Sequence, residues 1–234
     1  ILIVISVIIL TLFLTSIPVH ADKYPVKHLK LKNGMTVLLK RIPDSPAVSV
    51  CMVYRVGSRN EKLGITGISH LVEHMLYKGT KQYPKNKMAT LLNRIGADFN
   101  AFTSNDVTGF YQTVAPEFID LAVHIEADRM KNGAIGKNEL KIEKKITLSE
   151  MSELKNKPSY MLWRQILGTA FTHHPYMWPV QGSEEDIKKI KIHQARWYYK
   201  AHYKPKYAVL AIVGRFNEKH VIKLVKKFFN SQVN

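Results

Sequence analysis

The sequence predicts an α+β fold: a mainly antiparallel β-sheet with helices packed on one face. Residues 47–55 form an apolar strand pattern with enough β-branched and aromatic residues to lie centrally in a sheet, and residues 207–214 form a buried strand pattern. Hairpin signals over residues 28–40 and 98–115 favour antiparallel neighbours. Helical patterns lie between these segments without the regular period of a βαβ fold. We therefore expect one such domain over residues 22–234.

The composition limits the possible classes of protein. The 234 residues are 46% hydrophobic and 23% charged, so the chain can bury a sizeable core in one or two domains. Its formal net charge is +17, a value that can indicate nucleic acid or an anionic membrane surface as a partner. The lysines are scattered, however, and no nucleic-acid-binding motif accompanies them. We therefore expect no nucleic-acid partner, and a surface that favours acidic peptide segments or a membrane face.

The first 21 residues have the features of a secretory signal peptide. Residues 1–14 are a nearly continuous apolar run, and Val19-His20-Ala21 resembles a cleavage site. The run is shorter than the roughly 20 residues of a spanning helix, so a membrane anchor is the alternative. We expect export to a bacterial periplasm, with membrane contact only through this segment. The single cysteine, Cys51, has no intrachain partner, so no disulfide framework is expected.

Beyond this segment the chain alternates between strand and helix patterns. Asn33-Gly34 is a strong signal for the tight turn of the first hairpin. Ser183 occupies the first position of a capping box, with Asp186 three residues on in place of the usual Glu or Gln. Amphipathic helices are expected over residues 84–95, 116–130, 137–157, 159–170, 183–190, 193–203 and 217–230.

The most informative stretch is the sequence HLVEH, from His70 to His74. On a helix, His70 and His74 share one face, and Glu73 points to nearly the same side. Two imidazoles and one carboxylate suit a catalytic zinc site, because they supply two ligands and a base for water. The alternative is that these histidines are ordinary core or surface residues. Thr66 is a plausible N-cap, and the apolar residues of the opposite face are Ile68, Leu71, Val72 and Met75.

The order H-x-x-E-H resembles the inverzincins, and specifically the pitrilysin, insulinase and mitochondrial processing peptidase family. In that family the third zinc ligand is a Glu on a second helix, preceded seven residues earlier by another Glu. This sequence has Glu150, 76 residues after His74, and Glu143 seven residues before Glu150. The resemblance therefore implies one Zn²⁺ held by His70, His74 and Glu150, with Glu143 supporting the ligands from behind and Glu73 as the catalytic base.

The helix that carries Glu150 has an acidic stripe. Glu139, Glu143, Glu150 and Glu153 fall within about 80° of one another around a helix axis. Such a stripe is usually a solvated face. Because it is paired with a two-histidine helix in a strongly basic chain, we interpret it as turned partly toward the zinc.

The resemblance covers essentially all of residues 25–230, including Gly57-Ser58 and Glu61 in the loop before the zinc helix. The chain has Arg215 where the family usually has an acidic residue, which puts only a local turn in doubt. The family fold is a processing-peptidase-like domain that occurs as two copies in tandem, of which only the first binds zinc. No second copy is present in these 234 residues, so we expect a second homologous domain or subunit as a partner.

Two further segments resemble the substrate side of the family's active site. In the family, the strand that contains Asn100, Ala101 and Thr103 is a sheet edge on which a peptide substrate lies; an ordinary hairpin is the alternative. The loop with His173, His174 and Tyr176 lacks the spacing of a metal site, so we interpret it as a substrate-side or structural loop. His124, within a helix, is expected to be a packed or surface residue.

Taken together, these features indicate a zinc-dependent endopeptidase that hydrolyses peptides or unfolded protein segments. Glu73 would take a proton from water and pass it to the leaving amine. One alternative is a non-catalytic family subunit or truncated fragment that acts as an assembly partner. Another is a basic membrane-surface module with incidental metal affinity.

Overall fold

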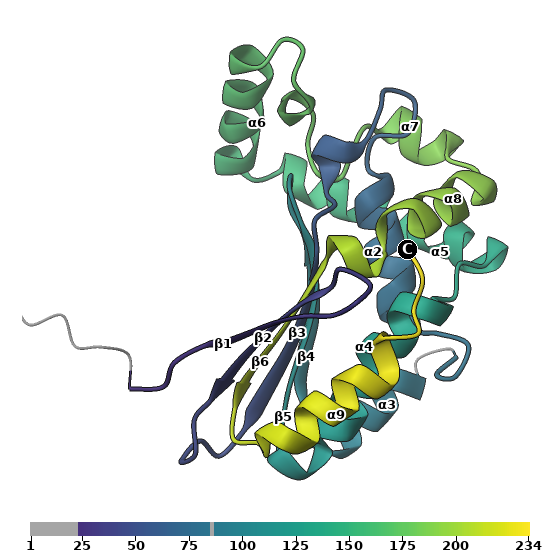
Figure 1. Cartoon of the computed structure of the whole chain (residues 1–234). Helices are drawn as coiled ribbons and strands as arrows, with labels where there is room; N and C mark the ends of the chain where they lie inside the picture. Colours follow the sequence, from purple (N-terminus) through teal and green to yellow (C-terminus); the bar gives the residue numbers. More distant parts are fainter. Residues whose placement is uncertain (1–22, 85–86) are drawn as a thin grey trace, which may run out of the picture.

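The computed structural model describes residues 23–84 and 87–234, and it confirms the α+β class. The six strands form one sheet in the order β1-β2-β6-β3-β5-β4. Figure 1 shows this sheet nearly edge-on, with α2, α4 and α9 on the same side of it. The strands are β1 (Lys27–Lys30), β2 (Thr36–Arg41), β3 (Val48–Tyr54), β4 (Asp98–Thr103), β5 (Thr108–Val114) and β6 (Ala208–Gly214).

The sheet is antiparallel except at one pair of strands. The hairpins β1–β2 and β4–β5 both form as expected, and β3 lies at the centre, antiparallel to β5 and to β6. Strand β6 comes late in the chain but lies between β2 and β3, and it runs parallel to β2 with Thr36 opposite Val209. This arrangement leaves β4 as an edge strand.

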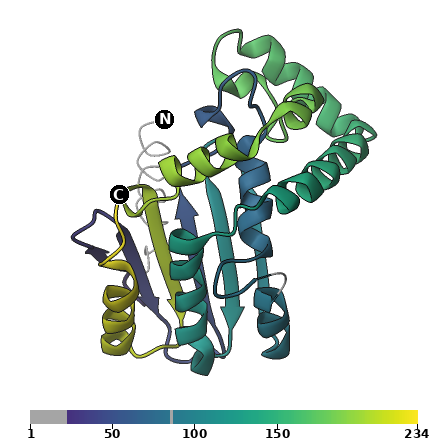
Figure 2. The same cartoon turned by 90° about the vertical axis from the view of Figure 1, so that its right-hand side faces the viewer.

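The helices cover one face of the sheet and extend past one of its ends. In Figure 2, which views the molecule from its helical side, helices lie across the sheet, and α6 stands apart beyond it. The helix expected from residue 84 begins at Lys87, after two residues that the structure does not describe. The main helices are α2 (Ile68–Lys78), α3 (Lys87–Arg94), α4 (Ile119–Asn132), α5 (Lys137–Lys155), α6 (Pro158–Ala170), α7 (Glu184–Lys189), α8 (Ile192–His202) and α9 (Glu218–Phe229).

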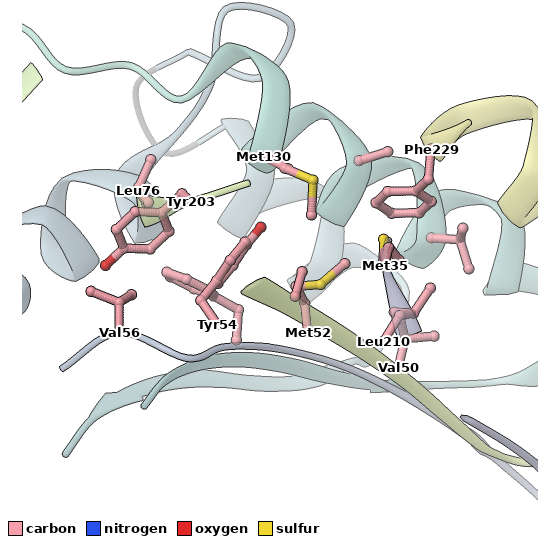
Figure 3. Close-up of a cluster of buried hydrophobic side chains, with 14 of the residues drawn as sticks. Met35, Val50, Met52, Tyr54, Val56, Leu76, Met130, Tyr203, Leu210 and Phe229 are labelled. Carbon is pink, nitrogen blue, oxygen red and sulfur yellow. The ribbon is translucent and has the colours of Figure 1, made fainter. Parts of the chain in front are cut away.

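The hydrophobic core fills the space between the sheet and the helices. On the central strand, Met52 lies opposite Phe110 of β5 and Leu210 of β6, and all three side chains are fully buried. Figure 3 shows helix side chains such as Leu76 and Phe229 meeting this layer. Burying a side chain of this size contributes roughly 1.5–3 kcal/mol, so the core fixes α2 firmly against the sheet.

The start of α2 differs from the prediction. Thr66 is not its N-cap; that position is Gly67, which has a φ of +86°. A Cβ atom at this position would lie 2.3 Å from the Gln181 carbonyl oxygen, so only glycine fits. The Glu61 carboxylate instead caps the helix, because it accepts hydrogen bonds from the backbone N–H groups of Gly67 (2.7 Å) and Ser69 (2.8 Å). The Thr66 hydroxyl donates to Asp186 Oδ2, 2.6 Å away.

The expected signal peptide, residues 1–21, lies outside the described residues. Within the part of the chain that the structure describes, none of the helices combines the length and the apolar character needed to cross a bilayer.

Candidate metal centre

Two histidines of α2 face the same space. His70 and His74 lie one helical turn apart, and their Nε2 atoms are 3.1 Å from each other. Both imidazoles are largely shielded, with side-chain exposures of 13% and 15%. The opposite face of α2 is buried in the core, as expected, through Ile68, Leu71, Val72 and Met75. The amphipathic pattern thus turns both imidazoles away from the core and toward α5.

The third candidate ligand, a carboxylate, comes from α5. Glu150 Oε2 lies 3.9 Å from His70 Nε2 and 3.8 Å from His74 Nε2. One ligand atom from each of these residues can be chosen so that all three lie within 4.8 Å of one another. Donor atoms around a tetrahedral zinc ion lie about 3.4 Å apart, as follows from Zn–N and Zn–O bonds of about 2.1 Å. Two imidazoles and one carboxylate at these distances therefore fit a metal ion that keeps a fourth position open.

A buried carboxylate orients one of the histidines. Glu143, two helical turns before Glu150, is only 2% exposed, and its Oε2 accepts a hydrogen bond from His74 Nδ1 at 3.2 Å. With the proton on Nδ1, the lone pair of Nε2 points into the centre. Among the described residues, His70 Nδ1 is buried without a hydrogen-bond partner. The two imidazoles are therefore supported unequally.

The surroundings favour at most one protonated imidazole. Burial, together with the nearby His74, lowers the pKa of His70 to about 3. Burial also acts to lower the pKa of His74, but the hydrogen bond to Glu143 and the charges of Glu73 and Glu150 outweigh it, so the pKa rises. Metal coordination needs neutral imidazoles, and His70 meets this condition at any physiological pH.

Glu73 lies beside the three candidate ligands but is held differently. Its side chain is 7% exposed, and its Oε2 accepts a hydrogen bond from the Thr103 hydroxyl at 3.1 Å. Burial raises the pKa of Glu73, although His74 and Thr103 partly oppose this. A carboxylate with a raised pKa binds protons more readily, as a general base requires.

These residues line an open cavity of about 400 Å³ between α2, α5 and β4. The expected substrate residues Asn100, Ala101 and Thr103 all contribute to its wall from the edge strand β4. Five further residues line the cavity although no sequence signal indicated them: Tyr77, Lys78, Phe102, Ile146 and Gln181. Gln181 comes from the loop that was interpreted as substrate-side or structural.

Other candidate residues lie elsewhere. Of the acidic stripe, Glu153 is exposed and Glu139 lines a different cavity, so the stripe faces the centre only through Glu143 and Glu150. His124 forms a hydrogen bond with the Tyr83 hydroxyl, as a packed histidine would. In the loop, His174 Nδ1 accepts a hydrogen bond from the backbone N–H of Tyr176.

The fold and this centre define a candidate metalloprotein whose metal lies between two helices and a sheet edge. Comparison with known families is consistent with that class. Residues 36–184 match the family described as Insulinase (Peptidase family M16), and residues 189–234 match the Peptidase M16 inactive domain. The chain belongs to the M16 insulinase family of peptidases, which confirms the resemblance drawn from the sequence.

Similar proteins include zinc proteases from several bacteria. The chain is 31% identical to Zinc protease PqqE of Helicobacter pylori over 98% of this chain and 52% of that protein. It is 30% identical to Uncharacterized zinc protease YmxG of Bacillus subtilis, over 88% of this chain and 50% of that protein. The chain thus spans about half the length of the curated relatives that it matches.

Solved structures show the same fold. A protease from Helicobacter pylori superposes with a TM-score of 0.86 at 30% identity, over 90% of this chain and 51% of that one. The first half of the periplasmic protease PqqL from Escherichia coli gives a TM-score of 0.81 at 20% identity, over 89% and 46% of the two chains. The second likeness is one of fold alone.

Proposed function

We propose that this chain is the zinc-binding domain of a metalloendopeptidase that hydrolyses peptides or unfolded protein segments. The observation that carries the proposal is the placement of three donor side chains within 4.8 Å of one another beside the buried carboxylate of Glu73. A structural zinc site normally has four protein ligands and favours cysteine. Three protein ligands and an adjacent base are typical of a catalytic zinc site that activates water for hydrolysis.

In this proposal His70, His74 and Glu150 hold one Zn²⁺, and Glu143 keeps His74 in the tautomer that ligation needs. When bound, zinc supplies Lewis acidity that polarises the peptide carbonyl and lowers the pKa of water. Glu73 takes a proton from the attacking water and delivers it to the leaving amine nitrogen. Thr103 holds the Glu73 carboxylate in position through its hydroxyl.

The edge strand β4 presents the substrate backbone to this site. Its outer side is unpaired within the sheet, so backbone N–H and C=O groups on that side can pair with an extended peptide. The Ala101 N–H donates to Asn100 Oδ1 at 2.9 Å, and a peptide that pairs with it must displace this side chain. Asn100, Ala101 and Thr103 lie on both the strand and the cavity wall. Backbone pairing of this kind binds many sequences, which suits a peptidase that acts on unfolded segments.

We propose that residues 22–234 form the zinc-bearing half of a two-half enzyme. The support is that the chain covers only 52% of the length of the Helicobacter pylori zinc protease and 50% of the length of the Bacillus subtilis zinc protease. Export is proposed from the apolar run and the Val19-His20-Ala21 sequence, and N-terminal sequencing of the mature protein tests for cleavage after Ala21.

Replacing Glu73 with Gln tests the proposed chemistry. The variant keeps all three ligands, so its zinc content should equal that of the wild type. Hydrolysis of an unstructured peptide should fall by about 10²–10⁴-fold, because the base is lost. Metal analysis and peptide cleavage are measured on the same preparations. Full activity in Glu73→Gln, or wild-type cleavage that survives removal of the metal by a chelator, would contradict the proposal.

A further inference from the structure

Two cavities flank the start of α5, and both are rich in basic residues. Figure 1 shows α5 and α8 beside each other on the helical side of the sheet. A cavity of about 540 Å³ lies between the end of α4, the first turn of α5 and α8, and one of about 490 Å³ lies between α5 and the start of α8. We call the surface around them the basic face; its basic residues are Lys81, Lys131, Arg196 and Lys200 at the first cavity, and Lys137, Lys141, Lys144 and Lys191 at the second.

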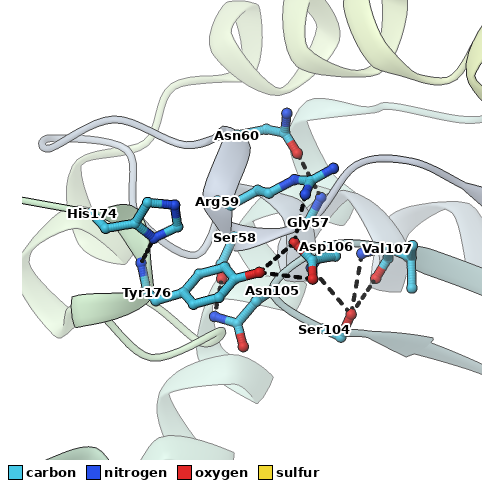
Figure 4. A network of polar contacts seen from close by, with 10 residues as sticks. All are labelled: Gly57, Ser58, Arg59, Asn60, Ser104, Asn105, Asp106, Val107, His174 and Tyr176. Carbon is cyan, nitrogen blue, oxygen red and sulfur yellow. Dashed lines mark hydrogen bonds and ion pairs between the residues drawn. The ribbon is translucent and has the colours of Figure 1, made fainter. Parts of the chain in front are cut away.

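The basic face has almost no negative charge to offset these cations. Among the described residues, Glu139 is the one acidic residue that lines either cavity, and its carboxylate lies against Gly136 at the start of its own helix. None of the basic side chains of the face forms an ion pair within the described parts of the chain. By contrast, Arg59 on another surface pairs with Asp106 at 2.8 Å, and Asp106 also accepts a hydrogen bond from Tyr176 (Figure 4). The basic face therefore keeps its full positive charge.

Helix α5 separates the basic face from the candidate metal centre. At about 100° per residue, Lys137, Lys141 and Lys144 lie within about 60° of one another around the helix axis. Glu143 and Glu150 lie more than about 120° away on the same helix, and they line the metal cavity instead. A ligand on the basic face thus approaches α5 from the side opposite the candidate ligands.

Apolar side chains accompany the charges of the basic face. Trp197 is 58% exposed on α8, one helical turn before Lys200, and Ile142 is 56% exposed next to Lys141. The second cavity also has an apolar lining between its lysines, formed by Leu140, Ile190 and Ile192. A free anion makes no use of such groups. A bilayer surface presents phosphate groups together with apolar carbon atoms, and tryptophan is enriched at that interface.

We propose that the basic face docks on the surface of a membrane that contains anionic lipids. Its lysines and arginine meet the lipid phosphates, and the Trp197 indole enters the interfacial region. This contact is additional to the one expected from residues 1–21, and it does not depend on the proposed hydrolysis. Because Glu143 and Glu150 lie on the other side of α5, docking leaves the candidate metal centre uncovered.

Binding to lipid vesicles tests the proposal directly. The protein used is residues 22–234, because all described strands and helices lie within it, and the apolar run of residues 1–14 would itself bind lipid. Sedimentation compares vesicles of phosphatidylcholine with vesicles of an equimolar mixture of phosphatidylcholine and the anionic lipid phosphatidylglycerol. Partitioning into the anionic vesicles should be stronger by about tenfold or more and should weaken as salt is added. Equal partitioning into both vesicles would overturn the proposal.

Two pairs of exposed lysines provide matched variants. Lys137 and Lys141 lie four residues apart at the start of α5, and Lys219 and Lys223 lie four residues apart at the start of α9, outside the basic face. Changing the α5 pair to Gln should weaken partitioning by about tenfold or more, since each lysine near an anionic surface contributes about fivefold. Changing the α9 pair to Gln should weaken it by less than about twofold, because charges far from the lipid are screened. Equal losses would show that net charge alone drives binding, against the proposal.

Tryptophan fluorescence identifies the side of the molecule that meets the lipid. On binding to anionic vesicles, the emission should shift to shorter wavelength as the Trp197 indole leaves water. Trp197→Phe should remove the shift. Trp163→Phe should keep it, because Trp163 is exposed to a similar degree, 59%, but lies on α6 away from the basic face. A shift that depends on Trp163 and not on Trp197 would assign the contact to α6 and overturn the proposal.

Duplex DNA serves as a soluble polyanion for comparison, because lysines also neutralise its phosphates. Wild-type protein that binds DNA through Lys137 and Lys141 but ignores anionic vesicles would make the basic face a nucleic-acid site, and the membrane proposal would fail. Vesicle binding that both the α5 lysine pair and Trp197 control supports it, whether or not the chain hydrolyses peptides.

Discussion

The two histidines of the centre have different partners, and this difference has a chemical consequence. His74 Nδ1 donates to Glu143, whereas His70 Nδ1 is buried without a partner among the described residues. A carboxylate behind an imidazole fixes its tautomer and makes its other nitrogen a stronger ligand. His74 should therefore contribute more to metal affinity than His70, and part of that contribution should depend on Glu143.

Replacing Glu143 with Gln should weaken zinc binding by about tenfold or more, because the charge behind His74 is lost while the side chain keeps its size. A chelator competition titration measures the affinity. Glu153→Gln is the matched control, since Glu153 is an exposed glutamate on the same helix. An affinity in Glu143→Gln equal to that of the control would show that Glu143 does not support the metal.

At the scale of the element, α2 is held at both ends by buried polar side chains. Glu61 accepts hydrogen bonds from two N–H groups at its start. Arg129 Nη1 donates to the Leu76 carbonyl oxygen near its end at 2.6 Å. Arg129 places a positive charge at the negative end of the helix dipole. Burial raises the pKa of Glu61 to about 8, so Glu61 stabilises the start of the helix through its hydrogen bonds rather than through a negative charge. The position of the candidate ligands thus depends on residues outside the cavity.

Replacing Glu61 with Ala should lower the free energy of unfolding by about 2 kcal/mol or more, because it leaves two buried N–H groups without an acceptor. Urea denaturation measures the loss. The neighbouring Lys62→Ala variant is the control, since Lys62 is exposed and should change stability by less than about 0.5 kcal/mol. Equal stability of the two variants would mean that Glu61 does not cap the helix.

Local patterns predicted most elements of the fold. The Asn33-Gly34 hairpin, the central position of β3 and the boundaries of α5 all follow from signals within a few residues. The insertion of β6 beside β2 does not, because it joins segments far apart in sequence. The true cap of α2 was missed for the same reason: Gly67 is required by the approach of the Gln181 carbonyl, which only the folded chain reveals.

The candidate site was predictable to a similar degree. Helical spacing alone placed His70 and His74 on one face, whereas Glu150 was reached through the family resemblance, and the structure brings all three together. Gln181 carried no signal because its loop has no periodicity. A cavity of about 190 Å³ likewise combines residues of α6 with the end of β4, and neither segment predicts the other.

At the scale of the whole molecule, the cavity is open, and the sheet edge contacts only one side of a substrate. The chain spans about half of the zinc proteases that it matches. A substrate that remains mobile over the metal loses much of the rate gain that comes from positioning. We therefore infer that a second homologous half completes the proposed enzyme.

Residues 22–234 alone should bind zinc yet hydrolyse an unstructured peptide pool slowly. Adding a second homologous half, covalently or as a separate chain, should raise the rate by at least tenfold. Peptide cleavage is assayed with and without that half. Equal turnover in both assays, blocked by a chelator, would show that one domain suffices.

The central claim is that His70, His74 and Glu150 together hold one Zn²⁺, and zinc content per chain tests it most directly. Elemental analysis of the wild type should give one zinc ion per chain. Glu150→Gln should lose most of the metal, whereas Glu153→Gln, changed three residues further along the same helix, should retain it. A fully loaded Glu150→Gln protein together with an empty Glu153→Gln protein would contradict the assignment of the third ligand.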